Sequence, residues 1–158
     1  MNDEEWVRSV PEEITNDTLW KMAVYRQALF LSELAWIDVT KLVKDRRTMR
    51  LSDQLYRSAG SISANLAEGY SYSSKKDQAR FFEYALGSAR ETRDWYYKAR
   101  HVLGEEVSLH RIRFLTQVIR QLLTMLPNLR GYSIQEESPG YEDYSIGFLL
   151  DKIPLPKD

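Results

Sequence analysis

The sequence LSDQLYRSAGSISANLAEG, residues 51–69, decides the fold class. Its apolar side chains recur every three or four residues, at Leu51, Leu55, Ala59, Ile62 and Leu66. An α-helix turns once in about 3.6 residues, so this spacing places all of them on one helical face. The stretch therefore predicts an amphipathic helix that buries one side.

The same stretch is unusually rich in small side chains. Gly60, with Ser58, Ser61, Ser63 and Ala64, makes one side of the predicted helix small. A glycine inside a helix costs about 1 kcal/mol relative to alanine. We expect the small side to let another helix approach closely.

Three further segments carry helical spacing. One spans residues 19–43, one follows a capping serine at Ser74 and ends at Gly104, and one runs from Ser108 to Pro127. No useful length alternates with a period of two, and the links are short, which favours antiparallel neighbours. The sequence predicts an all-α fold, an antiparallel up-down-up-down four-helix bundle with an irregular C-terminal tail.

Two tails are expected to flank the bundle of residues 17–127. Residues 1–16 form an acidic segment, and residues 128–158 form a Pro/Tyr-rich acidic tail. Residues 147–150, Gly-Phe-Leu-Leu, are too apolar for a purely solvated linker. We expect an extended segment that docks on its own bundle or on a neighbour's, the alternative being a loose terminus.

Composition narrows the class of protein. The chain has 158 residues, of which 43% are apolar, so it is long enough for one domain with a sizeable core. It has no cysteine, which excludes disulfides and thiol catalysis. The acidic start is no signal peptide, and no apolar run is long enough to span a membrane. These features predict a cytoplasmic protein without membrane partners.

The net charge of −1 conceals a strong asymmetry. Residues 18–130 carry a net +8, while residues 1–17 carry −5 and residues 131–158 carry −4. A basic body with acidic ends is compatible with an anionic partner. An uneven but merely solvated surface is the alternative.

Basic residues gather in three places and suggest contact with nucleic acid. Arginine and lysine neutralise phosphates, and arginine offers a planar fork that fits them. Trp95, Tyr96, Tyr97 and His101 lie among the second group and are candidates to stack on unpaired bases, unless they belong to the core or a subunit interface. The predicted nucleic-acid-binding residues are Lys44, Arg46, Arg47, Arg50, Arg93, Lys98, Arg100, Arg111 and Arg113.

A second polar set steps along the two central helices. We expect it to form a hydrogen-bonded structural layer in which Arg and Glu pair across helices, and a binding groove is the alternative. The predicted layer comprises Gln54, Arg57, Asn65, Glu68, Arg80 and Ser88.

Signatures of catalysis are missing from the sequence. It has no phosphate loop, dinucleotide fingerprint or zinc-protease motif, and only two histidines. We therefore expect no metal, no cofactor and no enzyme. An enzyme that uses Arg57, Asn65 and Glu68 on a small molecule remains as a minor alternative.

The residues of the two central helices resemble a known family. Residues 51–69 end in Asn65-Leu66-Ala67-Glu68-Gly69, and the continuation Ser74-Lys75-Lys76 … Arg80-Phe81-Phe82 … Ala85-Leu86-Gly87-Ser88 … Glu91 matches as well. This pattern resembles the bacterial four-helix-bundle family named for proteins encoded in intervening sequences of large-subunit ribosomal RNA genes. Leu66 replaces the family's usual isoleucine, and Arg90 and Thr92 also depart from its commoner residues.

The resemblance implies a function without catalysis. The same family includes the accessory variability determinant of diversity-generating retroelements, which implies a basic homo-pentamer that holds a reverse transcriptase and its template RNA. From residues and resemblance together we expect an oligomeric adaptor for structured RNA and a protein partner such as a reverse transcriptase. The alternative is a protein-only scaffold whose C-terminal tail docks on a partner or sister subunit.

Overall fold

The fold is described from a computed structural model that covers residues 3–131, 145–151 and 153–157. The elements are α1 (Asp3–Ser9), α2 (Glu12–Thr15), the 3₁₀ helix η1 (Thr18–Lys21), α3 (Ala23–Leu42), α4 (Met49–Tyr70), α5 (Lys75–Leu103), α6 (Glu105–Arg130) and α7 (Ile146–Asp151). The described residues contain helices and no strands, so the predicted all-α class is confirmed.

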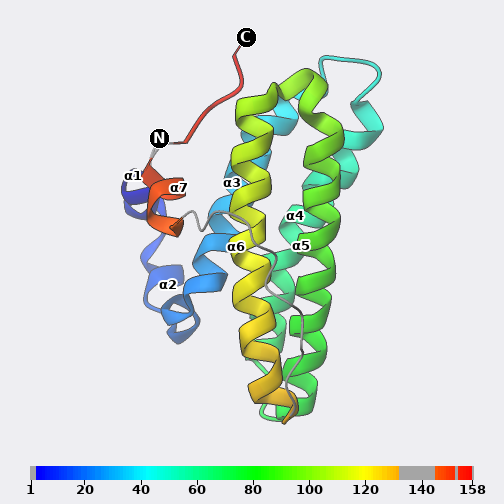
Figure 1. The fold of residues 1–158 in the computed structure, drawn as a ribbon. Coiled ribbons are helices and arrows are strands. Elements are labelled where there is room, and N and C mark those ends of the chain that lie inside the picture. Colours follow the sequence, from blue (N-terminus) through cyan, green and yellow to red (C-terminus); the bar gives the residue numbers. More distant parts are fainter. Residues whose placement is uncertain (1–2, 132–144, 152, 158) are drawn as a thin grey trace.

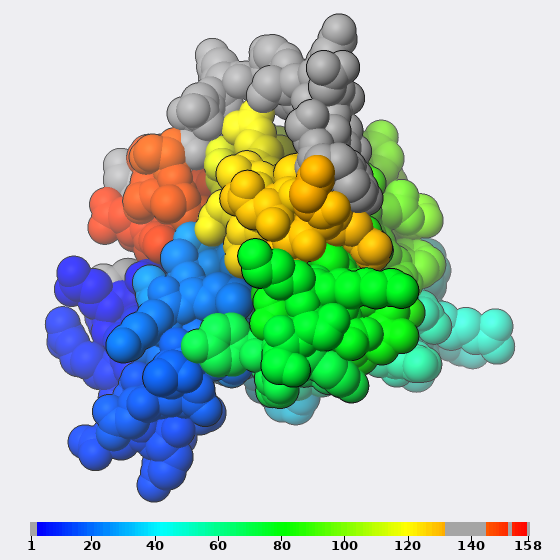
Figure 2. Space-filling view, turned by 90° about the horizontal axis from the view of Figure 1, so that it is seen from below, coloured from blue at the N-terminus to red at the C-terminus, as the bar shows by residue number. Residues whose placement is uncertain are grey.

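Four long helices, α3 to α6, lie side by side and build the body of the molecule (Figure 1). α4 packs between α3 and α5, α5 packs against α6, and α3 also contacts α6. The short helices α1, α2 and α7 lie on one side of this body, next to α3 and α6, as Figures 1 and 2 both show.

The core lies between the four long helices. Its fully buried side chains recur at helical spacing on every long helix, because each helix turns its apolar stripe inward. They include Leu31 and Leu34 of α3, Leu55, Ile62 and Leu66 of α4, Ala85 and Ala89 of α5, and Phe114, Leu115 and Leu122 of α6.

Local capping signals predicted the ends of α5 correctly. The Ser74 side chain accepts a hydrogen bond from the Asp77 amide, as a capping residue does. At the other end Gly104 has φ of 90°, a conformation that glycine adopts without strain. α5 therefore ends where the sequence indicates, and α6 starts at once.

The ends of α4 and α6 differ from expectation. α4 begins at Met49 after Thr48, whose buried hydroxyl donates to the Leu42 carbonyl at 2.6 Å. α6 begins at Glu105 and continues through Pro127 to Arg130. A proline in the last turn removes one backbone donor, and the helix ends at Gly131, which has φ of 73°.

The acidic N-terminal segment is folded onto the body. Trp6 of α1 is buried, with its ring 4.9 Å from that of Phe30 and 6.0 Å from that of Trp20. Helix α1 is too short to be stable through its own hydrogen bonds alone. Burial of the large Trp6 side chain therefore stabilises it against the body.

Part of the C-terminal tail docks on the same chain. Residues 146–151 form helix α7 against α6, and Leu149 is buried. The expectation of an extended segment is therefore wrong for these residues, which form a short helix that buries Leu149 and leaves Phe148 exposed. Residues 153–157 are not helical, and residues 132–144, which include three of the tail's tyrosines, lie outside the described residues.

Of the two glycines in α4, only Gly69 lies where the neighbouring helix leaves no room for a side chain. A Cβ atom built on Gly69 would lie 2.9 Å from the Phe81 Cβ and 2.9 Å from the Phe82 ring. A Cβ on Gly60 would meet nothing within 4 Å. Phe81 and Phe82 of α5 thus require a glycine in the last turn of α4.

We predict opposite effects for two glycine substitutions in α4. Gly69→Ala should lower the free energy of unfolding by about 1–3 kcal/mol, because the new methyl group overpacks Phe81 and Phe82. Gly60→Ala is the matched control and should raise it by about 0.5–1 kcal/mol, because alanine is the better helix former. Urea denaturation followed by circular dichroism measures both, and equal effects would contradict the assigned contact.

Candidate nucleic-acid interface

The link between α3 and α4 is a basic turn. Lys44, Arg46 and Arg50 are exposed there. The Arg47 guanidinium donates to both carboxylate oxygens of Asp45, at 2.9 Å to Oδ1 and 2.5 Å to Oδ2, and these bonds lower the pKa of Asp45 to about 2. Three of the four predicted cations in the link are thus open to an anionic ligand, and the fourth is shared with a carboxylate.

The last turns of α5 present cations on aromatic rings. The Lys98 ammonium lies 4.4 Å from the centre of the Trp95 ring, and the Arg100 guanidinium lies 4.0 Å from that of Tyr97. Carboxylates accompany both, since Lys98 pairs with Asp94 and Arg100 lies 3.8 Å from Glu105. Tyr97 is 56% exposed, so its ring remains open to a planar ligand.

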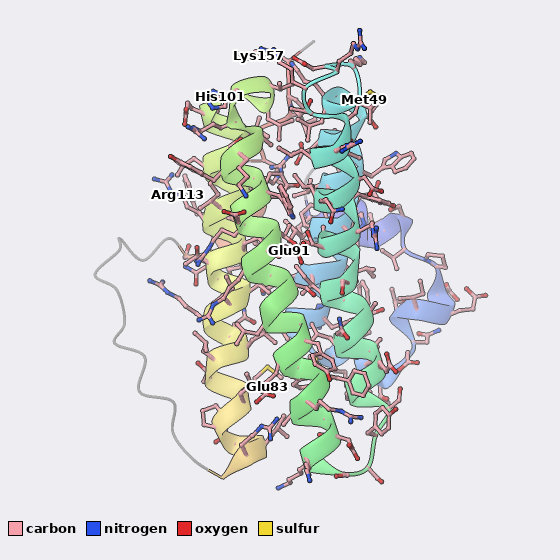
Figure 3. The ribbon with its side chains drawn as sticks, turned by 90° about the vertical axis from the view of Figure 1, so that its right-hand side faces the viewer. Met49, Glu83, Glu91, His101, Arg113 and Lys157 are labelled. Atoms are coloured by element: carbon pink, nitrogen blue, oxygen red, sulfur yellow. The ribbon has the colours of Figure 1, made fainter. Side chains whose placement is uncertain are left out.

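These two groups meet at the same end of the four long helices. Met49 at the start of α4, His101 near the end of α5 and Lys157 of the C-terminal segment all lie there (Figure 3). The short α3–α4 and α5–α6 connections bring this about, because each returns the chain at that end. We call this surface the basic end, with the cations Lys44, Arg46, Arg47, Arg50, Lys98 and Arg100.

Two further predicted residues lie away from the basic end. Arg113 projects from α6, farther along the helices than His101 (Figure 3). Arg93 is half-buried, and its guanidinium donates to the Thr116 hydroxyl at 3.3 Å. The structure therefore does not bring all predicted phosphate-binding residues together.

Arg111 is not a surface residue, which corrects its assignment as a phosphate contact. Its side chain is 0% exposed and forms a bidentate ion pair with Asp38, 2.8 Å from Nε to Oδ2 and 3.2 Å from Nη2 to Oδ1. A bound phosphate would have to displace this buried carboxylate. The stacking role considered for Tyr96 is wrong for the same reason, since Tyr96 is also 0% exposed.

The buried ion pair joins three helices and the C-terminal segment. The Tyr96 hydroxyl donates to the Asp38 carboxylate at 2.8 Å, and burial raises the pKa of Tyr96 well above 10. Arg111 also donates to the Pro154 carbonyl at 3.0 Å. Asp38 lies on α3, Tyr96 on α5 and Arg111 on α6, so this one cluster holds helices from three parts of the sequence.

His110 extends the cluster toward α7 and is neutral. The Arg111 guanidinium has no acceptor atom, so it donates to Nδ1 of His110 across 2.9 Å. The ring proton then resides on Nε2, which donates to the Leu149 carbonyl at 2.6 Å. Burial first, and the positive charge of Arg111 second, lower the pKa of His110 to about 4.

The predicted pairing of Arg and Glu across helices does not occur at Arg57, Glu68 and Arg80. Gln54, Arg57, Glu68 and Arg80 are exposed. Arg57 lies 3.8 Å from Asp53 and Arg80 lies 3.5 Å from Asp77, each on its own helix. These positions flank the apolar stripe, where long side chains reach water and pair locally.

A smaller polar layer does lie between α4 and α5, and it includes the other two predicted residues. The Ser88 hydroxyl donates to that of Ser61 at 3.1 Å, and the Asn65 amide donates to Ser61 as well, at 2.9 Å. The Thr92 hydroxyl donates to that of Ser58 at 2.9 Å, fully inside the structure. Hydroxyl groups fit between closely packed helices where guanidinium groups do not.

Other candidate chemistry is sparse in the described part of the chain. Residues 3–131, 145–151 and 153–157 contain no group of three or more His, Asp or Glu placed to hold a metal ion. None of the helices described is long and apolar enough to cross a membrane.

Sequence reasoning missed Asp38, although a signal existed, and it left open whether Tyr96 belongs to the core, where the structure places it. Asp38 follows Leu31 and Leu34 at seven and four residues, and Arg111 precedes Leu115 by four. Each charge therefore stands at a position of the buried stripe. An acid and a base in core positions of two helices predict a buried pair.

Comparison with known proteins supports the fold and names a family. The model of the family described as "23S rRNA-intervening sequence protein" matches residues 20–126. No curated protein matches. A crystal structure of a protein of unknown function from the S23 ribosomal protein family, from Bacteroides thetaiotaomicron, is 23% identical with a TM-score of 0.62, covering 66% of this chain and 98% of that one.

Breaking the buried ion pair should be costly. Arg111→Met leaves the Asp38 carboxylate buried without its cation and should lower the free energy of unfolding by about 3–5 kcal/mol. The double variant Asp38→Leu with Arg111→Met removes both charges and should recover most of this loss. Arg57→Met breaks an exposed pair and should change stability by less than about 1 kcal/mol.

Chemical denaturation of the three variants tests this assignment. A loss below about 1 kcal/mol for Arg111→Met, or no recovery in the double variant, would show that the pair does not hold the helices together.

Stability should also depend on pH through His110. Its pKa is lower in the folded chain, about 4, than in the unfolded chain, about 6.5, so the unfolded state binds the proton first as pH falls. The free energy of unfolding should thus drop between pH 6.5 and 4, on the order of 3 kcal/mol in total. His110→Gln should remove this part of the pH profile, whereas His101→Gln, at an exposed histidine, should leave it unchanged.

Proposed function

The chain belongs to the 23S rRNA-intervening sequence protein family, and on this premise we propose that it is a non-enzymatic adaptor that binds structured RNA through its basic end. The supporting observation is the set of exposed cations Lys44, Arg46 and Arg50 at the same end of the helices as Lys98 and Arg100, which lie over the Trp95 and Tyr97 rings (Figure 3). Phosphates would contact the α3–α4 link, and unpaired bases would stack on Tyr97.

The geometry of the basic end suits a folded RNA better than a small anionic ligand. The cations are spread over the α3–α4 link, the first turn of α4 and the last turns of α5. A spread of separate charges recognises a polyanion, whose binding releases counterions and weakens with salt. Glu105, Glu106 and Asp94 lie in the same region, which keeps the affinity moderate and favours RNA shapes that avoid these acids.

The arrangement of the four long helices is part of this proposal. We propose that α3 to α6 form the antiparallel up-down-up-down bundle that the sequence predicts, with short links that alternate between its two ends. Successive contacts of α3 with α4, α4 with α5 and α5 with α6 support it. This topology is what gathers the end of α5 and the α3–α4 link at one surface.

The proposal also includes assembly into an oligomer and binding of a protein partner. The resemblance stated above implies a homo-pentamer and a reverse transcriptase, and the family membership is compatible with both. Purification from the native cell at low salt, followed by sequencing of bound RNA and mass spectrometry of bound proteins, tests them. Recovery of a homo-oligomer free of RNA would favour the alternative, a protein-only scaffold.

Charge reversal at the basic end should weaken RNA binding. Arg46→Glu with Arg50→Glu should reduce affinity for a 23S rRNA intervening-sequence transcript at least about tenfold and should flatten its salt dependence, because two phosphate contacts are lost. Lys75→Glu with Lys76→Glu is the matched control, since both lysines are exposed at the start of α5.

Fluorescence anisotropy over a range of salt concentrations measures both variants, with circular dichroism to confirm folding. The proposed interface is wrong if the two double variants weaken binding equally or if neither weakens it.

A further inference from the structure

A cleft lies where the N-terminal segment meets the long helices. It has a volume of about 450 Å³, within the range of ligand sites. The proposed RNA interface uses none of its residues. Its walls come from α1, α2 and the residues between them on one side and from α3 and α4 on the other, and they include Trp6, Val10, Ile14, Leu29, Trp36 and Tyr56.

Two aromatic rings form an open wall of this cleft. Trp36 of α3 and Tyr56 of α4 have ring centres 5.7 Å apart at an angle of 59°. They are 58% and 42% exposed, and Ile14 opposite them is 37% exposed. Two inclined aromatic faces beside an apolar surface attract a cationic group that is carried on an apolar stem.

Among the described residues that line the cleft, Glu33 is the only charged one. It precedes Trp36 by three residues on α3, so its carboxylate and the indole share one face of that helix. Among the described residues, no basic side chain forms an ion pair with it, whereas Glu4, Asp45, Asp53, Asp77, Glu83 and Asp94 all have basic partners.

The surroundings of the cleft are also negative. The first turns of α1 and α2 carry Asp3, Glu4, Glu5, Glu12 and Glu13. Charge complementarity therefore favours a cationic ligand and disfavours RNA. The N-terminal wall, residues 6–14, lies outside the family match at 20–126.

We propose that this cleft binds a basic segment of another protein, holding one arginine or lysine side chain against Trp36 and Tyr56 with its charge toward Glu33. The apolar neighbours of that side chain would pack on Leu29, Val10 and Ile14. The cleft is large enough for more than one side chain, which suits a peptide rather than an isolated cation.

A second copy of this chain does not fit the cleft as well. The chain's own densest basic segment, the α3–α4 link, is a short turn held by the buried Thr48 hydroxyl on the Leu42 carbonyl. It is not an extended strand or a free helix that could enter a groove. A partner with an accessible basic segment meets the requirement, and this site is separate from the basic end.

Isothermal titration calorimetry with a short amidated peptide that alternates leucine and arginine tests the proposal. Two matched peptides replace arginine with glutamate or with citrulline, which keeps the shape and removes the charge. The arginine peptide should bind with a Kd below about 1 mM and at least about tenfold more tightly than the citrulline peptide.

Variants of the folded full chain locate the binding. Trp36→Ala and Tyr56→Ala should each reduce affinity about tenfold, and Glu33→Gln should reduce it and weaken its salt dependence. Tyr97→Ala and Glu68→Gln are matched controls, because both residues are exposed outside the cleft, and they should leave the affinity for the peptide unchanged.

Three results would overturn the proposal. They are no binding at about 1 mM peptide, equal binding of the citrulline peptide, and undiminished binding by Trp36→Ala. Analytical ultracentrifugation of the same variants tests whether a second copy of the chain occupies the cleft instead. If Trp36→Ala dissociates an oligomer that the parent chain forms, a second copy fills the cleft and the partner proposal is wrong. RNA binding by Trp36→Ala should be unchanged.

Discussion

The buried ion pair between Asp38 and Arg111 is the constraint on which the rest of the structure depends. Both side chains are 0% exposed, so each charge persists only because the other, the Tyr96 hydroxyl and the Pro154 carbonyl satisfy it. Such a pair adds little stability compared with an apolar core of the same shape, but it penalises every arrangement that separates its members. It therefore fixes the relative positions of α3, α5 and α6.

The same pair determines which cations remain for a ligand. Arg111 is fully buried and paired with Asp38, so it offers no charge to a ligand. Arg113, two residues later on α6, is half-buried. The same cluster also fixes the C-terminal segment. Arg111 donates a hydrogen bond to the Pro154 carbonyl, and its neighbour His110 donates one to the Leu149 carbonyl. Two surfaces lie outside this cluster, the basic end with its exposed Lys44, Arg46 and Arg50 and the acidic aromatic cleft. We propose that these two unlike surfaces let the molecule join an RNA to a basic protein segment.

Local signals made much of the fold predictable, and long-range pairing limited the prediction of the site. The stripe through Leu55, Ile62 and Leu66 predicted α4, and Ser74 and Gly104 fixed α5, because each acts within a few residues. The burial of Arg111 depends on Asp38, 73 residues away, and charge counting cannot distinguish it from Arg113. The prediction that Arg57 and Glu68 pair across helices was wrong, because both side chains lie beside the apolar stripe of α4. There, local partners and water satisfy long charged side chains. Helix α1, which Trp6 anchors, was not predicted because it is too short to show the periodic spacing of apolar residues.

Photo-crosslinking of a 4-thiouridine-labelled intervening-sequence transcript to the full chain, with the modified residues identified by mass spectrometry, tests the central claim most directly. The account predicts crosslinks at the α3–α4 link and on the last turns of α5, with Tyr97 among them. It predicts none on the cleft residues Trp36 and Tyr56. Crosslinks that cluster in the cleft, or at the opposite end around Lys75 and Lys76, would contradict it.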